Sequence, residues 1–248
     1  MRIAVVGATG RIGTLTGQVL AEAGHEVVPV SRSRGVDAYT GDGLEAALAG
    51  AEAVIDASNT PAQDEAAILE FFGTSTRNLI AAGRAAGVRH HVLLSIVGID
   101  HGQPVAHYAG KREQERLVRE AGVPFSIVRA TQFHDFPAMT AEWTEQDGVA
   151  TVAPLLLQPI APADVARFLA EVATGRPLDG TIDVAGPETQ DLVDMARRTF
   201  AARGRTVRLV PTWRGVFGTD MAGEVLLPGP DARLGGVTFD DWLAAGAS

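Results

Sequence analysis

The chain has 248 residues, a hydrophobic fraction of 46% and a formal net charge of −9. This length suits one large α/β domain, or one domain with a small appendage, and it is enough to bury a substantial core. The acidic balance argues against a broad basic surface, so nucleic acid is not an expected partner. No apolar run approaches the roughly 18 residues of a membrane span, and the absence of cysteine excludes disulfides, thiolate metal sites and a cysteine nucleophile.

The first elements in the chain predict a dinucleotide-binding turn. A strand-type run ending at Val6 leads into a glycine-rich segment, and a helical pattern follows over 12–23. Gly7 permits a tight turn, Gly10 lets a pyrophosphate approach the backbone, and Gly13 lets the helix pack against the strand. The helix N-terminus offers N–H groups and the positive end of its dipole to phosphates. The residues expected to contact the cofactor here are Gly7, Thr9, Gly10, Arg11, Ile12 and Gly13.

Strand and helix patterns alternate through the first half of the chain. The predicted strands are 3–6, 26–30, 37–40, 53–57, 91–95 and 125–129. The predicted helices are 12–23, 44–48, 62–86 and 105–120. This alternation predicts an α/β fold of the Rossmann type, a doubly wound parallel sheet with helices on both faces and ligands at the carboxyl ends of its strands.

The second half of the chain is less regular. Its predicted elements are helices at 163–172 and 192–202, a strand at 181–185 and a capped terminal helix at 238–243. Glycine and proline are dense between 211 and 236, where periodicity is poor. We therefore interpret residues 1–131 as the NAD(P)-binding core. Residues 132–248 are interpreted as a small C-terminal cap that covers the site and shapes a substrate pocket, with some segments returning to the core.

The end of the second predicted strand indicates the cofactor. An NAD site usually places a carboxylate there, whereas an NADP site places an arginine near the 2′-phosphate. Here Ser31 and Arg32 follow the strand, and no carboxylate comes before Asp37, which falls in the next predicted strand. Arg11 lies in the glycine loop and is placed to reach the same phosphate. We therefore expect NADP, with NAD as the less favoured alternative.

Further cofactor contacts are expected after the next two predicted strands. Asp42 is either an acceptor for the adenine edge or only the N-cap of the helix at 44–48. Candidates at the end of the strand 53–57 are Ala57, Ser58 and Asn59.

One lysine stands out in the composition. Of 21 basic residues, 20 are arginine and only Lys111 is lysine. A compact ammonium can approach two hydroxyls or shift the pKa of a neighbour, whereas a guanidinium is larger and planar. Composition alone leaves two interpretations open, a retained function or the chance survival of one lysine.

Taken together, the motifs resemble the short-chain dehydrogenase/reductase superfamily, and more narrowly its atypical, NmrA-like NAD(P)-binding branch. Beside the glycine loop, the segments that carry the resemblance are 94–98 (LSIVG), 108–111 (YAGK), 127–133 (IVRATQF), 162–166 (PADVA) and 184–188 (VAGPE). In this superfamily a Tyr-x-x-x-Lys pair and an upstream serine carry out the chemistry: lysine holds the nicotinamide ribose, and tyrosine exchanges a proton with the substrate as hydride moves. The resemblance assigns Lys111 and Ser95 to the lysine and the serine.

The tyrosine position departs from this pattern. Four residues before Lys111 the chain has His107, and Tyr108 lies three before it; both share a helix face with the lysine. Three alternatives follow: His107 donates the proton, Tyr108 does so after a small helix rotation, or neither acts. The first two describe an NADP(H)-dependent oxidoreductase of atypical short-chain type acting on a small carbonyl or enone-like substrate. The third describes a non-catalytic NADP(H)-binding redox sensor or regulatory protein.

The remaining candidates concern the substrate and the surroundings of the protein. Substrate contacts are expected from His101, Gln132, Phe133 and His134. No histidines and carboxylates show metal-ligand spacing, so no metal site is expected. A strand begins at once, so we expect no signal peptide and a cytoplasmic protein. The sequence leaves the oligomeric state open.

Overall fold

The structure, a computed structural model, describes residues 1–101, 105–215 and 217–246. It contains a seven-stranded parallel sheet with the strand order β11-β8-β5-β4-β3-β1-β2. The strands are β1 (Arg2–Val6), β2 (Glu26–Val30), β3 (Ala53–Asp56), β4 (His90–Ile96), β5 (Phe125–Ala130), β8 (Gly180–Ala185) and β11 (Arg233–Leu234). Since β1 pairs with both β2 and β3, the strand order reverses beside β1, where open α/β sheets bind ligands.

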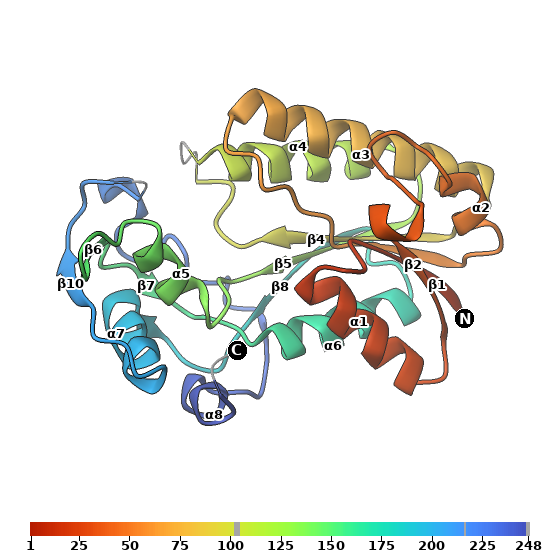
Figure 1. Ribbon diagram of the computed structural model, residues 1–248. Helices are drawn as coiled ribbons and strands as arrows, with labels where there is room; N and C mark the ends of the chain where they lie inside the picture. Colours follow the sequence, from red (N-terminus) through yellow and green to blue (C-terminus); the bar gives the residue numbers. More distant parts are fainter. Residues whose placement is uncertain (102–104, 216, 247–248) are drawn as a thin grey trace. The chain divides into compact units, whose positions relative to one another are not determined.

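Helices cover both faces of this sheet (Figure 1). On one face lie α3 (Glu65–Ala85) and α4 (Ala106–Glu120), and on the other lie α1 (Arg11–Glu22) and α6 (Pro162–Thr174). The short α2 (Leu44–Leu48) contacts α3. The predicted doubly wound α/β class is therefore confirmed.

The chain divides into two compact units. The first contains Met1–Arg129 and Val165–Ile182, and the second contains Ala130–Asp164 and Asp183–Ser248. Most of α6 thus belongs with the nucleotide-binding fold, although it follows residue 131. Elements of the second unit are α5 (Phe136–Glu142), β6 (Val149–Val152) paired with β10 (Arg208–Pro211), β7 (Leu156–Leu157) paired with β9 (Gln190–Asp191), α7 (Leu192–Ala202) and α8 (Phe239–Ala244).

One predicted strand is wrong. Residues 37–40 form a turn, because glycines with positive φ surround them: Gly35 (76°), Gly41 (88°) and Gly43 (73°). The Asp37 carboxylate accepts a hydrogen bond from the backbone N–H of Tyr39 at 2.8 Å, which closes the turn. The strands predicted at 91–95 and 125–129 are therefore β4 and β5, the fourth and fifth in the chain.

Local signals determined the ends of several elements correctly. α7 has the predicted bounds, and Thr238 caps α8 in a reciprocal capping box with Asp241. The short strands β6, β7, β9, β10 and β11 were not predicted, and neither was α5. In the described part of the chain, no helix is both long and apolar enough to cross a membrane.

Buried aliphatic side chains hold β1, β2 and β3 to their helices. Leu44 and Leu48 of α2 and Leu79 of α3 meet Val6 and Val54 in one fully or nearly fully buried cluster. Each buried aliphatic side chain contributes about 1.5–3 kcal/mol relative to exposure. This packing supports the strand ends from which the glycine loop and the loop after β3 emerge.

Candidate functional site

The glycine loop lies against the ends of two neighbouring strands. The N–H of Gly7 donates to the carbonyl of Val30 at 3.0 Å, and Gly7 has a φ of 76°. A Cβ atom at Gly7 would lie 2.6 Å from the Ala57 carbonyl oxygen, and one at Gly13 would lie 2.2 Å from the Gly7 carbonyl oxygen. Both positions therefore require glycine, as the sequence predicted.

The same loop presents the start of α1. Gly10 is the N-cap and has no side chain to cap the helix, and the first turn contains no acidic residue. Thr9 and Gly10 are exposed, Arg11 is half-buried, and Ile12 is buried. The first backbone N–H groups of a helix have no intrahelical acceptor and carry the positive end of its dipole. This cradle fits the phosphates of a dinucleotide, with Ile12 contributing only its backbone.

Basic groups follow β2. Ser31 precedes a short 3₁₀ turn, Arg32–Arg34, and its hydroxyl lies 3.2 Å from that of Ser33. Arg32 and Arg34 are exposed, and neither enters an ion pair among the residues that the structure describes. Asp37, the first carboxylate after β2, uses an oxygen to close its own turn. The end of β2 thus presents guanidinium groups and hydroxyls rather than a carboxylate.

Asp42 is exposed and accepts a hydrogen bond from the Thr40 hydroxyl at 2.8 Å. The N-cap of α2 is Gly43, in a left-handed conformation, so the N-cap alternative for Asp42 is wrong. Its contact with an adenine edge stays a prediction.

The loop after β3 is anchored at both of its first residues. The Ala57 N–H donates to the Val6 carbonyl at 3.1 Å, and the Ser58 N–H donates to the Asp56 carboxylate at 2.9 Å. Ser58 is buried, whereas Asn59 is exposed and accepts from the N–H of Thr60. These contacts hold the predicted cofactor segment beside the glycine loop.

Lys111 lies on α4 and is only 5% exposed. Its ammonium donates to the Gln114 side-chain oxygen at 2.9 Å, the Leu94 carbonyl at 3.1 Å and the Ser58 carbonyl at 3.4 Å. It also lies 4.7 Å from the centre of the Phe72 ring. Burial lowers the pKa of Lys111 to about 8, against the opposing charges of Asp56 and Glu115.

His107 is the residue in the expected tyrosine position. Its ring packs edge-on against Phe72, with the ring centres 5.4 Å apart. Burial, and next the charge of Lys111, lower the pKa of His107 to about 4. Only about one imidazole in a thousand carries a proton at pH 7 under these conditions, which argues against His107 as the proton donor.

Tyr108 and Ser95 are both buried, at 7% and 2% exposure. The Ser95 hydroxyl meets no hydrogen-bond partner within the described residues. A buried hydroxyl without a hydrogen-bond partner destabilises the folded protein. Such a group is typical of a site where the hydroxyl acts on a ligand.

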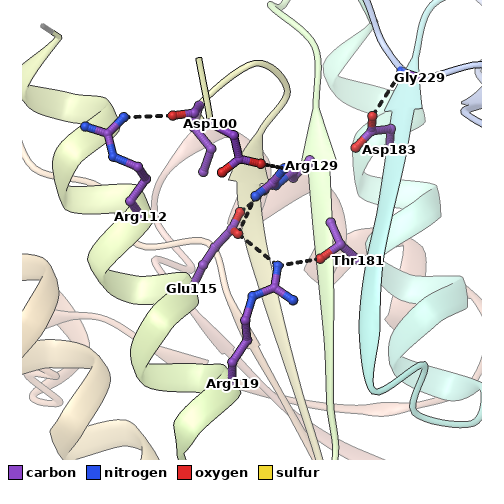
Figure 2. A network of polar contacts seen from close by, with 9 residues as sticks. Asp100, Arg112, Glu115, Arg119, Arg129, Thr181, Asp183 and Gly229 are labelled. Atoms are coloured by element: carbon purple, nitrogen blue, oxygen red, sulfur yellow. Dashed lines mark hydrogen bonds and ion pairs between the residues drawn. The ribbon is translucent and has the colours of Figure 1, made fainter. Parts of the chain in front are cut away.

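An ion-pair network, not predicted from the sequence, lies one helical turn along α4 from Lys111 (Figure 2). Glu115, 5% exposed, accepts from both Nε (2.8 Å) and a terminal nitrogen (2.6 Å) of Arg129, and from Arg119 at 3.1 Å. Arg129 also pairs with Asp100 at 2.5 Å. The network fixes α4 to the end of β5 and to the loop after β4. The Glu115–Arg129 pair could not be predicted because its members are 14 residues apart on different elements.

The predicted substrate residues lie in different environments. His101 is exposed in the first unit. In the second unit His134 is 1% exposed, packs against the rings of Phe239 and Trp242, and contacts the Val237 carbonyl at 3.2 Å. This packing argues against a substrate contact for His134.

Gln132 and Phe133 follow β5 in the second unit. Both side-chain polar atoms of Gln132 are buried and meet no hydrogen-bond partner within the described residues. Phe133 is half-buried and pairs through its backbone with Ile160. Their substrate contacts stay predictions.

Comparison with known proteins agrees with this geometry. The profile of an NAD(P)H-binding family matches residues 7–176. Over 227 residues the chain is 30% identical to the (4-alkanoyl-5-oxo-2,5-dihydrofuran-3-yl)methyl phosphate reductase of Streptomyces griseus, which covers 83% of this chain and 75% of that protein.

Two solved structures share the fold. A short-chain dehydrogenase/reductase superfamily protein from Agrobacterium tumefaciens with bound NAD has a TM-score of 0.73 and 18% identity, over 100% of this chain and 96% of that one. The NADPH-dependent quinone oxidoreductase of Escherichia coli, complexed with NADPH, has a TM-score of 0.62 and 22% identity, over 85% of this chain and 78% of that one.

Proposed function

Because the chain belongs to the NAD(P)H-binding family and is an NAD(P)-dependent oxidoreductase, we propose that it uses NADPH to reduce an enone-like substrate. The observation that carries the choice of substrate is the combination of a buried, cationic Lys111 with a neutral His107. The similarity to a reductase supports catalysis over the alternative of a non-catalytic redox sensor.

The residues after β2 support NADPH as the cofactor. Arg32 is exposed there, and an oxygen of the Asp37 carboxylate already accepts the N–H of Tyr39. An NAD site has a carboxylate at this position, which holds the ribose hydroxyls and would repel a 2′-phosphate. The described residues at the end of β2 provide no such carboxylate. Arg11, in the glycine loop, adds a second guanidinium for the same phosphate.

Lys111 is suited to hold the nicotinamide ribose. All three of its protons already have acceptors, and the Ser58 carbonyl at 3.4 Å is the most distant of them. That contact is the one that a ribose hydroxyl replaces at the least cost. NADPH, when bound, supplies a hydride.

The substrate class follows from the need for a proton donor. Reducing an isolated ketone leaves a localised alkoxide, which requires a positioned acid. His107 does not supply one at neutral pH, because its pKa is near 4. Adding hydride to the β-carbon of an enone instead leaves an enolate whose charge spreads onto the carbonyl oxygen. The α-carbon then takes a proton from water, so one hydride and one proton, which together are two electrons and two protons, have been added across the C=C bond.

The name of the Streptomyces relative supports this choice. It describes an unsaturated five-membered lactone with an alkanoyl group on the ring double bond and a methyl phosphate. Such a double bond is conjugated to two carbonyls, which makes it a strong hydride acceptor.

The test is a matched substrate pair followed through NADPH absorbance. We expect an acylated butenolide to consume NADPH, and its ring-saturated ketone analogue to be inert. We also expect His107→Phe to keep activity on the butenolide. Equal rates on both compounds, or loss of all activity in His107→Phe with NADPH binding intact, would contradict the proposal.

A further inference from the structure

A buried chain of hydrogen bonds connects Lys111 to a carboxylate that it does not touch. The side-chain oxygen of Gln114 accepts from Lys111 at 2.9 Å. The nitrogen of the same amide donates to the Asp56 carboxylate and to the Thr76 hydroxyl, both at 3.0 Å. Gln114, Asp56 and Thr76 are each 0% exposed, so water does not replace these contacts.

The neighbours of Gln114 determine the orientation of its amide. An ammonium only donates hydrogen bonds, and a carboxylate only accepts them. The amide oxygen must therefore face Lys111 and its nitrogen must face Asp56. Reversing the amide would place two donors against each other at one end and two acceptors at the other.

Asp56 also controls the loop that follows β3. Its second oxygen accepts from the backbone N–H of Ser58 at 2.9 Å, and the Ser58 carbonyl is itself an acceptor for Lys111. One carboxylate thus determines the position of the loop on one side and of the ammonium, through Gln114, on the other.

We propose that Gln114 and Asp56 are positioning residues that hold Lys111 and the loop 57–59 as one unit and keep the buried ammonium charged. The negative charge of Asp56 acts on Lys111 through the polarised amide of Gln114. The expected effect of this unit on NADPH binding rests on the proposed function. The coupling, by which Asp56 acts on Lys111 through Gln114, does not.

The other groups around Lys111 leave Asp56 as the main adjustable charge. On α4 itself, His107 is neutral at pH 7, and the charge of Glu115, which raises the Lys111 pKa less than that of Asp56 does, is shared with Arg129 and Arg119. From β4, His91 lies near Asp56, and burial lowers its pKa. From α3, the packed groups are Phe72 and Thr76, which carry no charge.

The single lysine of the chain makes the coupling directly measurable. Protein labelled with lysine carrying ¹³C at the ε-carbon gives one lysine signal, which needs no assignment, and its titration by NMR reports the pKa of Lys111. Removing a buried counter-charge shifts a pKa by roughly one unit.

Two substitutions are expected to shift this pKa in opposite directions. Asp56→Asn removes the charge and sets an amide nitrogen against one of two donors, Gln114 or the Ser58 N–H, so we expect the Lys111 pKa to fall by about one unit. Gln114→Glu brings a carboxylate to the ammonium, and Asp56 takes the proton that two adjacent buried carboxylates share, so the negative charge moves into contact with Lys111 and we expect a rise of about one unit. Glu113→Gln is the control: it removes a carboxylate from the same helix that pairs with Arg116, and we expect no shift.

Thermal unfolding checks that each variant folds. If only one of the two variants folds, its Lys111 pKa alone is enough to test the proposal. An unchanged Lys111 pKa in a folded variant, or shifts of the same sign in both, overturns the proposal. Adding NADPH to the labelled wild type separates the two claims. If NADPH leaves the lysine signal unmoved, the role of Lys111 in the proposed function fails, whereas the coupling stands or falls on the titrations alone.

Discussion

The affinity for NADPH is expected to fall as the pH rises through 8, because Lys111 loses its charge there. Its pKa is lowered to about 8 by burial. From that pKa the ammonium form makes up about nine-tenths of the molecules at pH 7 and about one-tenth at pH 9. Lys111→Met removes the titrating group and keeps an unbranched side chain of similar length.

The size of the effect follows from the contact that is lost. A hydrogen bond from a charged donor contributes about 1.5–3 kcal/mol, and a neutral one about 0.5–1.5 kcal/mol. The charged and the neutral hydrogen bond differ by about 1–1.5 kcal/mol. This difference corresponds to a roughly five- to tenfold loss of affinity for NADPH. By linkage, bound NADPH raises the pKa of Lys111 by about one unit. The dissociation constant therefore stays level to pH 7, rises between about pH 8 and 9, and levels again above that range.

The assay is a fluorescence titration with NADPH at a series of pH values and constant ionic strength. Circular dichroism at each pH confirms that the protein is folded. We expect Lys111→Met to bind weakly at pH 7 and to show no change across the same range. A wild-type curve parallel to that of Lys111→Met would refute the assignment of the ammonium to the cofactor.

Three further outcomes are expected. Arg32→Ala weakens NADPH about tenfold and leaves NADH unchanged, because it removes one charge-assisted contact to the 2′-phosphate; Arg34→Ala is the neighbouring control, and calorimetry that finds equal affinities for NADH and NADPH in the wild type contradicts the expectation. Gly13→Ala destabilises the protein by about 1–3 kcal/mol, because its Cβ would lie 2.2 Å from the Gly7 carbonyl oxygen. Gly17→Ala, on the same helix, has only a Val27 methyl at 3.6 Å and stabilises by about 0.5–1 kcal/mol; denaturant unfolding with equal effects at both positions argues against the tight turn. For His107, the folded pKa of about 4 lies below the ordinary 6.5, so the unfolded chain takes up a proton first and stability falls as the pH drops from 6.5 to 4. That loss is about 3 kcal/mol at most, and unfolding of His107→Phe between these pH values is expected to show a shallower decline; an identical slope would mean that His107 is not buried.

Local sequence patterns predicted most of the helices and strands of the nucleotide-binding fold. The glycine spacing in 7–13 predicted the turn because two of its constraints are local: the φ of 76° at Gly7 and the 2.2 Å between a Cβ at Gly13 and the Gly7 carbonyl oxygen. The cap of α8 and the bounds of α7 followed from the same kind of short-range signal. The prediction of a strand at 37–40 was wrong because alternating polarity gives no information on the positive φ of the surrounding glycines.

The sequence by itself also determined that Lys111 is unusual, and its resemblance to a superfamily assigned it a role. Only the tertiary structure decided the charge state of the site. Gln114 lies one helical turn from Lys111, but Asp56 is 58 residues from Gln114, on another element. The low pKa values of Lys111 and His107 arise from burial between packed helices, which no periodicity encodes. Hydrogen bonds between neighbouring residues can be predicted from the local sequence. The desolvation of a side chain, in contrast, depends on every element that packs around it.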